Sequence, residues 1–121
     1  EIIKKHKNIK LRKNHKYSTD QYDVICIYLN DKKSAVKVFN KFKKQGIPTS
    51  ILPTARRWHY AGEWKHIWKT NNNYKNTYYN NWNKCKNLLD RTVSIPISIL
   101  ETRKSLNVKL EKINNILRII S

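Results

Sequence analysis

The sequence contains no methionine, only two glycines, two cysteines and three prolines, and just 8 acidic residues. Without a methionine, we expect either that a segment was removed from the front of the chain or that the chain is the downstream part of a longer protein, with essential residues upstream of Glu1. A Gly-rich phosphate loop and a dinucleotide-binding fingerprint are both excluded. The cysteines are not at CxxC spacing, which excludes a disulfide scaffold and predicts two free thiols in a reducing, cytoplasmic compartment.

Long hydrophobic runs are also absent. No segment approaches the roughly 20 apolar residues that a membrane-spanning helix needs, and the N-terminus lacks the apolar stretch of a secretory signal. The sequence therefore predicts a soluble, cytoplasmic protein without a membrane partner. Its 121 residues are enough for one domain with a modest core.

Positive charge is what the sequence has in excess, with 26 lysines and arginines and a formal net charge of +18. Such a balance is typical of proteins that bind nucleic acid or an anionic surface. Here lysine far outnumbers arginine, and the basic residues are spread along the chain rather than gathered in one stripe. We interpret most of this charge as solvated surface and do not expect nucleic acid as a partner. A basic module that binds single-stranded nucleic acid is kept as the alternative function.

The first half of the chain predicts a strand, a helix and a second strand. Residues 22–29 (YDVICIYL) form the β-branched and aromatic run of a buried strand. Asn30 or Asp31 can cap the following helix, which ends at Gly46 in a left-handed conformation. Residues 49–53 (TSILP) predict a short strand that completes a β-α-β unit. Helical spacing predicts that the inward face of the helix consists of Ala35, Val38, Phe39 and Phe42.

The second half predicts a helix, a strand and a final helix. An aromatic stripe over residues 74–89 predicts a helix that turns Cys85 inward. Residues 92–99 (TVSIPISI) alternate strictly and predict a half-buried strand with an inward face of Val93, Ile95, Ile97 and Ile99. Thr102 can cap an amphipathic helix over residues 103–120. The predicted fold is α/β, an α+β-like small domain with a three- to four-stranded mixed sheet covered by helices.

Residues 54–68 (TARRWHYAGEWKHIW) concentrate aromatic rings, arginines and histidines. A metal site is not expected, because His59 and His66 stand seven positions apart with no carboxylate or thiol at ligand spacing. The tryptophans at 58, 64 and 68 have two open interpretations, a substrate-facing wall or core packing under a helix. We expect RRWHY to face a ligand and EWKHIW to pack beneath it, with His66 at the surface.

The order of these elements, with KKQGIPTSILP, RRWHYAGEW and RTVSIPISI as anchors, resembles a known domain. It is similar to the C-terminal small domain of the fold-type I, pyridoxal phosphate-dependent sugar aminotransferases of the DegT/DnrJ/StrS family. The closest likeness is to the branch that aminates the 8-position of a deoxy-octulosonate sugar, over about residues 9–120. The resemblance implies that residues 1–16 are a helix tail or connector from an upstream large domain, and that residues 17–121 are the small domain.

The resemblance also implies an activity. Family members use pyridoxal phosphate, bound mainly by the large domain, to transfer an amino group from an amino acid to a keto or aldehydo sugar for cell-surface polysaccharide. They are homodimers, and their Schiff-base lysine would lie upstream of Glu1, so no catalytic residue is assigned here and this segment alone would be inactive.

The small domain of the family contributes side chains that face the sugar. The positions that match here are Arg56, Arg57, Trp58, His59 and Tyr60. An acidic sugar offers a carboxylate, for which an arginine fork is the best matched partner. Its hydroxyls suit His59, and its apolar ring faces suit Trp58 or Tyr60.

Overall fold

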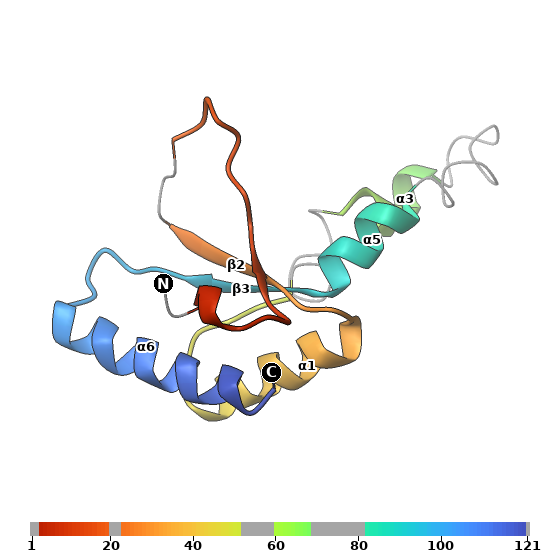
Figure 1. Ribbon diagram of the computed structural model, residues 1–121. Helices are drawn as coiled ribbons and strands as arrows, with labels where there is room; N and C mark the ends of the chain where they lie inside the picture. Colours follow the sequence, from red (N-terminus) through yellow and green to blue (C-terminus); the bar gives the residue numbers. More distant parts are fainter. Residues whose placement is uncertain (1–2, 20–22, 52–59, 69–81, 121) are drawn as a thin grey trace.

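The computed structural model describes residues 3–19, 23–51, 60–68 and 82–120. Within them the chain forms a small α/β domain, built on a three-stranded antiparallel sheet with helices on one face (Figure 1). The strands, in their order across the sheet, are β1 (Lys10–Leu11), β2 (Val24–Tyr28) and β3 (Thr92–Pro96).

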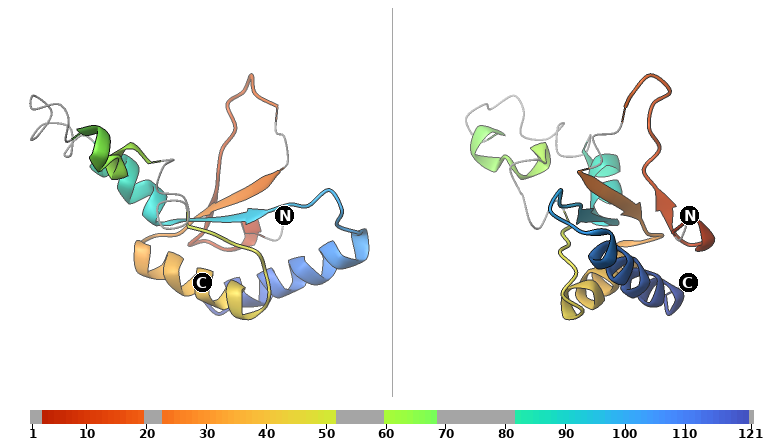
Figure 2. Two further views of the ribbon diagram at one scale, coloured as in Figure 1. Left: turned by 180° about the vertical axis from the view of Figure 1, so that it is seen from behind. Right: turned by 90° about the vertical axis from the view of Figure 1, so that its left-hand side faces the viewer.

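Two long helices cover that face. They are α1 (Lys32–Lys44) and α6 (Arg103–Arg118), which pack side by side beneath the sheet in all views of Figures 1 and 2. Two shorter helices, α3 (Lys65–Trp68) and α5 (Asn83–Asp90), project from one end of the sheet. Of the predicted ligand-facing residues, Tyr60 is described, and it directly precedes the short turn η3 (Ala61–Glu63), which leads into α3.

The core lies between the sheet and the two long helices. Alternation along the strands turns Ile27 and Val93, which are cross-strand partners, toward the helices, and both are completely buried. The buried helix residues recur at intervals of three and four, which places them on one face of each helix. They are Ala35, Val38 and Phe42 of α1 and Ile113, Ile116 and Leu117 of α6.

Local signals at both ends of α1 act as the sequence predicts. Asp31, one of the two candidates, is the N-cap, and its carboxylate accepts a 2.8 Å hydrogen bond from the backbone N–H of Ser34. At the other end Gly46 has a φ of 69°, a left-handed conformation that glycine adopts without a Cβ clash. Both predicted boundaries of this helix are confirmed.

The N-terminal residues belong to the same core. A short 3-10 turn, η1 (Ile3–Lys5), precedes β1, which pairs with β2. Ile3 and Ile9 are buried in the core, and Nε2 of His6 lies 3.3 Å from Oδ1 of Asn114 in α6. Residues 3–11 are thus packed against the sheet and α6; the domain boundary expected at residue 16 stays a prediction.

The prediction of a mixed sheet is wrong for the described strands. β3 inserts beside β2 and pairs with it antiparallel, so β2 has antiparallel neighbours on both sides. The strand predicted over residues 49–53 is reduced, in its described part, to one antiparallel bridge between Ser50 and Ser94. Strand β3 therefore lies in the sheet between β2 and Ser50, which belong to the two ends of the predicted β-α-β unit.

The prediction for residues 92–99 needs two corrections. The strand ends at Pro96, and Ile99 is 99% exposed instead of facing inward, because Ile97 donates its backbone N–H to Asp23 and a turn follows. Thr92 and Ser94, expected on an exposed face, are buried. Ser94 pairs with Ser50, while the hydroxyl of Thr92 donates to the carbonyl of Leu88 at 2.6 Å.

Helix α5 is short and has little apolar burial. Cys85 is exposed, which contradicts the prediction that it faces inward. The helix α5 projects from one end of the sheet (Figure 2), away from the core between the sheet and the two long helices. Cys26 and Cys85 are both free thiols. Across the described ranges, no helix combines the length and apolar character that crossing a membrane requires.

Candidate functional site

Four of the five predicted sugar-facing residues, Arg56, Arg57, Trp58 and His59, lie outside the described residues. The fifth, Tyr60, is described, as are the residues that precede and follow the segment. The structure therefore describes the two residues that flank this segment, Ile51 and Tyr60, and the elements that they contact.

The upstream end is fixed by hydrogen bonds to β3. Ser50 and Ser94 exchange two backbone hydrogen bonds of 3.0 and 2.8 Å, and the hydroxyl of Thr49 donates to the carbonyl of Ser94 at 3.0 Å. Ile51, the next residue, is buried in the core. Two of the sequence anchors, KKQGIPTSILP and RTVSIPISI, thus lie side by side although Thr49 and Ser94 are 45 positions apart.

The downstream end is fixed by Tyr60. Its side chain is 5% exposed, and its hydroxyl donates to the backbone carbonyl of Trp82 at 3.3 Å. Burial raises the pKa of Tyr60, and the nearby thiol of Cys85 acts in the same direction, so the phenol is protonated at neutral pH. The ring is packed into the protein in this conformation, and its role toward a sugar stays a prediction.

Gly62 allows Tyr60 to pack in this way. Gly62 lies in η3 (Ala61–Glu63), and a Cβ built on it would overlap the ring carbons and the hydroxyl of Tyr60. No other residue type leaves this space empty.

Substitution of Gly62 by alanine is therefore expected to displace the Tyr60 ring and lower the free energy of unfolding by about 1 to 3 kcal/mol, the usual range for overpacking. Thermal unfolding measures the loss, and the amide resonance of Trp82 reports the broken contact. Gly46→Ala is the matched control, because its Cβ would meet no atom within 4 Å and only its φ is strained. An unshifted Trp82 resonance in Gly62→Ala would contradict the assigned contact.

Residues downstream of Tyr60 form only a partly buried layer. Trp64 is half-buried and outside the core cluster, whereas Ile67 and His66 are exposed. The surface position predicted for His66 is confirmed, and Trp64 does not fill the main core.

Trp82 adds a polar group beside the site that the sequence did not single out. Its Nε1 is buried and has no hydrogen-bond acceptor within the part of the chain that the structure describes. Its backbone carbonyl accepts from the hydroxyl of Tyr60, so the backbone of Trp82 lies next to Tyr60. In the sequence Trp82 is one member of the aromatic stripe over residues 74–89, and helical spacing of this kind indicates packing rather than a site.

A charged cluster holds α5 against the start of α1. Asp90 Oδ2 lies 2.5 Å from Nζ of Lys86, one helical turn earlier, and 3.4 Å from Nζ of Lys32. Burial alone would raise the pKa of Asp90, but the hydrogen bond and charges of the two lysines outweigh it and hold that pKa below its ordinary value. The same hydrogen bond raises the pKa of Lys86.

Asp90→Asn is expected to lower the free energy of unfolding at pH 7 by about 1 kcal/mol, a value discounted for the exposure of the lysines. A lowered folded-state pKa stabilises the fold above the unfolded pKa, and this contribution is lost as the pH falls through the folded value. The difference between wild type and variant should therefore shrink below about pH 4. Urea titrations at several pH values measure it, and a difference that grows on acidification would contradict the pairing.

Lys86 does not suit a Schiff base with pyridoxal phosphate. A lysine that forms a Schiff base needs a lowered pKa, whereas the pKa of Lys86 is raised by Asp90. Over residues 3–19, 23–51, 60–68 and 82–120, no three His, Cys, Asp or Glu side chains are grouped to hold a metal ion. Pyridoxal phosphate, as the resemblance implies, would need residues from elsewhere in the protein.

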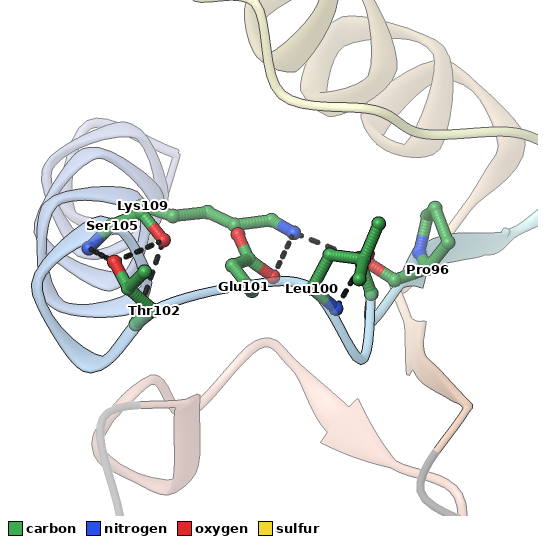
Figure 3. A network of polar contacts seen from close by, with 7 residues as sticks. Pro96, Leu100, Glu101, Thr102, Ser105 and Lys109 are labelled. Carbon is green, nitrogen blue, oxygen red and sulfur yellow. Dashed lines mark hydrogen bonds and ion pairs between the residues drawn. The ribbon is translucent and has the colours of Figure 1, made fainter.

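The turn between β3 and α6 presents a second surface (Figure 3). Lys109 Nζ donates to Glu101 Oε2 at 3.1 Å and to the carbonyl of Pro96 at 3.2 Å, and Thr102 caps α6 by accepting from the backbone N–H of Ser105. These contacts hold a turn whose apolar side chains are unburied: Ile99 is 99% and Leu100 86% exposed.

No protein-family profile matches the chain, and no curated protein matches its sequence.

Proposed function

We propose that this chain is the C-terminal small domain of a pyridoxal phosphate-dependent aminotransferase that transfers an amino group from an amino acid to an acidic keto or aldehydo sugar. The fold-type I assignment, the homodimer and the cytoplasmic location belong to the same proposal. The cofactor is bound mainly by the large domain, and the part of this domain is to bind and orient the sugar.

One observation carries the proposal. The bridge between Ser50 and Ser94 brings two anchors of the family resemblance together at one edge of the sheet. The third anchor begins at Arg56, five positions after Ile51. Chance likeness in a lysine-rich sequence gives no reason for segments so far apart in the chain to be neighbours. An antiparallel sheet with α1 and α6 on one face is also compatible with a small domain that rests against a larger one.

The exposed turn at Ile99 and Leu100 supports the proposal that this domain packs against another domain. Two adjacent large apolar side chains, almost fully exposed and held by the Lys109 contacts, are typical of a surface that packs against another domain. In the proposed enzyme this turn contacts the large domain. Such a contact would hold the small domain in position over the active site.

Within the proposed site, Arg57 and Arg56 bind the sugar carboxylate as planar, permanently charged forks. His59 exchanges hydrogen bonds with sugar hydroxyls, and Trp58 covers an apolar face of the ring. Tyr60 terminates the segment and orients it, because its ring is buried against Gly62 and its hydroxyl is bound to Trp82. Pyridoxal phosphate supplies the electron sink for amino transfer when bound by the rest of the enzyme.

The experiment is a test of cofactor binding in the full-length protein. We expect the purified protein to hold pyridoxal phosphate with a visible absorbance band that changes when an amino acid donor such as glutamate is added and returns when the keto sugar follows. A full-length protein that shows no cofactor band would overturn the proposal. Tight, steeply salt-dependent binding of a single-stranded oligonucleotide would favour the alternative instead.

A further inference from the structure

An open groove of about 470 Å³ lies where the end of α1, the turn after β3 and the first half of α6 meet. Much of its lining is apolar, and part of that apolar surface is exposed: Leu100 is 86% and Val108 49% exposed. The other apolar lining residues are Ile47 and Pro48 after α1, and Pro96 and Ile97 at the end of β3. An exposed apolar surface with a polar rim is typical of a site that another protein segment covers.

Polar contacts fix the wall of the groove that the turn after β3 forms. Lys109 reaches across from α6 and donates to Glu101 and to the carbonyl of Pro96 (Figure 3). The side chains of Lys109 and Glu101 are only 14% and 17% exposed, so salt screens this ion pair little. The backbone N–H of Leu100 donates to Oγ of Ser98 at 3.2 Å. Leu100 is thus presented on an ordered turn, and an ordered surface loses less conformational entropy when it binds.

The rim of the groove carries exposed positive charge. Lys112 lines the groove from α6, and its Nζ donates only a long 3.5 Å contact to the carbonyl of Gln45, a group without net charge. No carboxylate lies three or four positions from Lys112 along α6, where a helical partner would be. Lys44, which precedes Gln45, ends a helix that has no acidic residue. Among the described residues that line the groove, Glu101 is the only acidic one, and Lys109 binds it.

The charge of the whole chain decides which kind of segment can fill this groove. Of the 8 acidic residues, only Glu1 and Asp20 lie outside the described part, and the net charge of +18 already counts both. A second copy of this domain would bring the same positive excess to the groove, and like charges that face each other across an interface oppose binding. The occupant that fits is therefore an acidic segment.

We propose that this groove is the docking site for an acidic, partly apolar segment of the large domain, with apolar side chains packed on Leu100 and Val108 and a carboxylate bound by Lys112. The inference rests on the proposed function for the existence of the large domain, and it adds the chemistry of the segment that makes the contact. A carboxylate gives Lys112 a charge-assisted hydrogen bond in place of its long contact with Gln45. Apolar burial supplies most of the affinity, and the charge pair selects the segment.

Photo-crosslinking in the full-length protein identifies the occupant. The crosslinker p-benzoylphenylalanine replaces Val108, and after irradiation the captured peptide is sequenced by mass spectrometry. We expect a monomer-sized product whose captured peptide comes from the same chain, outside residues 1–121, and contains large apolar residues together with Asp or Glu. The same crosslinker at Val36 is the matched control, because Val36 is 40% exposed on α1 and does not line the groove. It should not capture that peptide.

Charge reversal tests the part assigned to Lys112. Lys112→Glu should lower the yield of the crosslinked product at position 108 roughly tenfold, the effect of losing one charge-assisted contact. Lys104→Glu reverses an exposed charge in the first turn of the same helix, outside the groove lining, and should change the yield less than about twofold. Both lysines are exposed, so both variants should keep the circular dichroism of the wild type.

Several results would overturn the proposal: no product, a dimer-sized product, a peptide from another protein, a captured peptide without acidic residues, or equal losses in the two charge variants. The cofactor absorbance of the same preparation separates this test from that of the proposed function. A cofactor band without the captured peptide would overturn the groove assignment alone. The captured peptide without a cofactor band would support the groove assignment and contradict the aminotransferase.

Discussion

Replacing Arg57 by alanine in the full-length protein is expected to raise KM for an acidic sugar about tenfold to a hundredfold, while kcat changes little. A hydrogen-bonded charge pair contributes about 1.5 to 3 kcal/mol, and each 1.4 kcal/mol is a factor of ten in affinity. The carboxylate does not react, so its binding energy is the same in the ground and transition states and its loss appears in KM. Steady-state kinetics with varied sugar at saturating donor measure the change.

Arg103→Ala serves as the control for Arg57→Ala, because it removes the same charge from an exposed position at the start of α6. Its KM should match that of the wild type, and both variants should keep the cofactor absorbance. Loss of the cofactor band in Arg57→Ala would show that Arg57 acts on the cofactor or on folding. An unchanged KM would remove Arg57 from the sugar site.

Phe42→Ala is expected to lower the stability of the domain by about 3 to 5 kcal/mol, the range for removing a buried phenylalanine. Phe42 is completely buried in the layer between α1, α6 and the sheet, so its loss leaves a cavity that the rigid strands cannot close. Hydrogen exchange by mass spectrometry on the peptides of β2 and β3, in the full-length protein, measures the change in opening free energy.

Phe39→Ala is the matched control for Phe42→Ala, since Phe39 lies on the same helix but only partly buried, beside the core. It should cost less than half as much. Equal losses in the two variants, or exchange protection of β3 that does not respond to Phe42→Ala, would contradict the position of the core between α1 and the sheet.

The parts of the fold that local chemistry decides could be predicted from the sequence. The cap at Asp31, the left-handed Gly46 and the cap at Thr102 each follow from one residue and its near neighbours, and all three are confirmed. The inward face of α1 could be predicted for the same reason, because spacing along one helix fixes which side chains share a face. The inward position predicted for Cys85 was wrong, because spacing alone does not show which part of a helix the rest of the protein covers.

Pairing across the sheet could not be predicted, because it joins residues far apart in the chain. Strand β3 lies beside β2 and pairs with Ser50 on its other side. The sequence contains no sign of this arrangement. The predictions of a mixed sheet and of an exposed face with Thr92 and Ser94 were therefore wrong. Ile99 continued the alternation of β3, but the pattern carries no sign of the turn that follows Ile97.

Only part of the site could be anticipated in the same way. The resemblance singled out Tyr60, and its burial against Gly62 and Trp82 depends on packing that composition does not reveal. The cavity of about 670 Å³ lined by Arg12 and Arg91 could not be predicted from the sequence, because its basic residues come from two separate segments of a chain rich in lysine. The sugar-facing roles of Arg56, Arg57, Trp58 and His59 stay predictions.

The most direct measurement is transfer of ¹⁵N from labelled glutamate to a keto or aldehydo octulosonate, with the full-length protein and pyridoxal phosphate, read by mass spectrometry of the sugar. We predict that the label appears in an amino sugar, and that the transfer stops when pyridoxal phosphate is withheld. A sugar that stays unlabelled although the protein holds the cofactor and deaminates glutamate would contradict the proposed substrate class. Failure to bind the cofactor at all would contradict the aminotransferase itself.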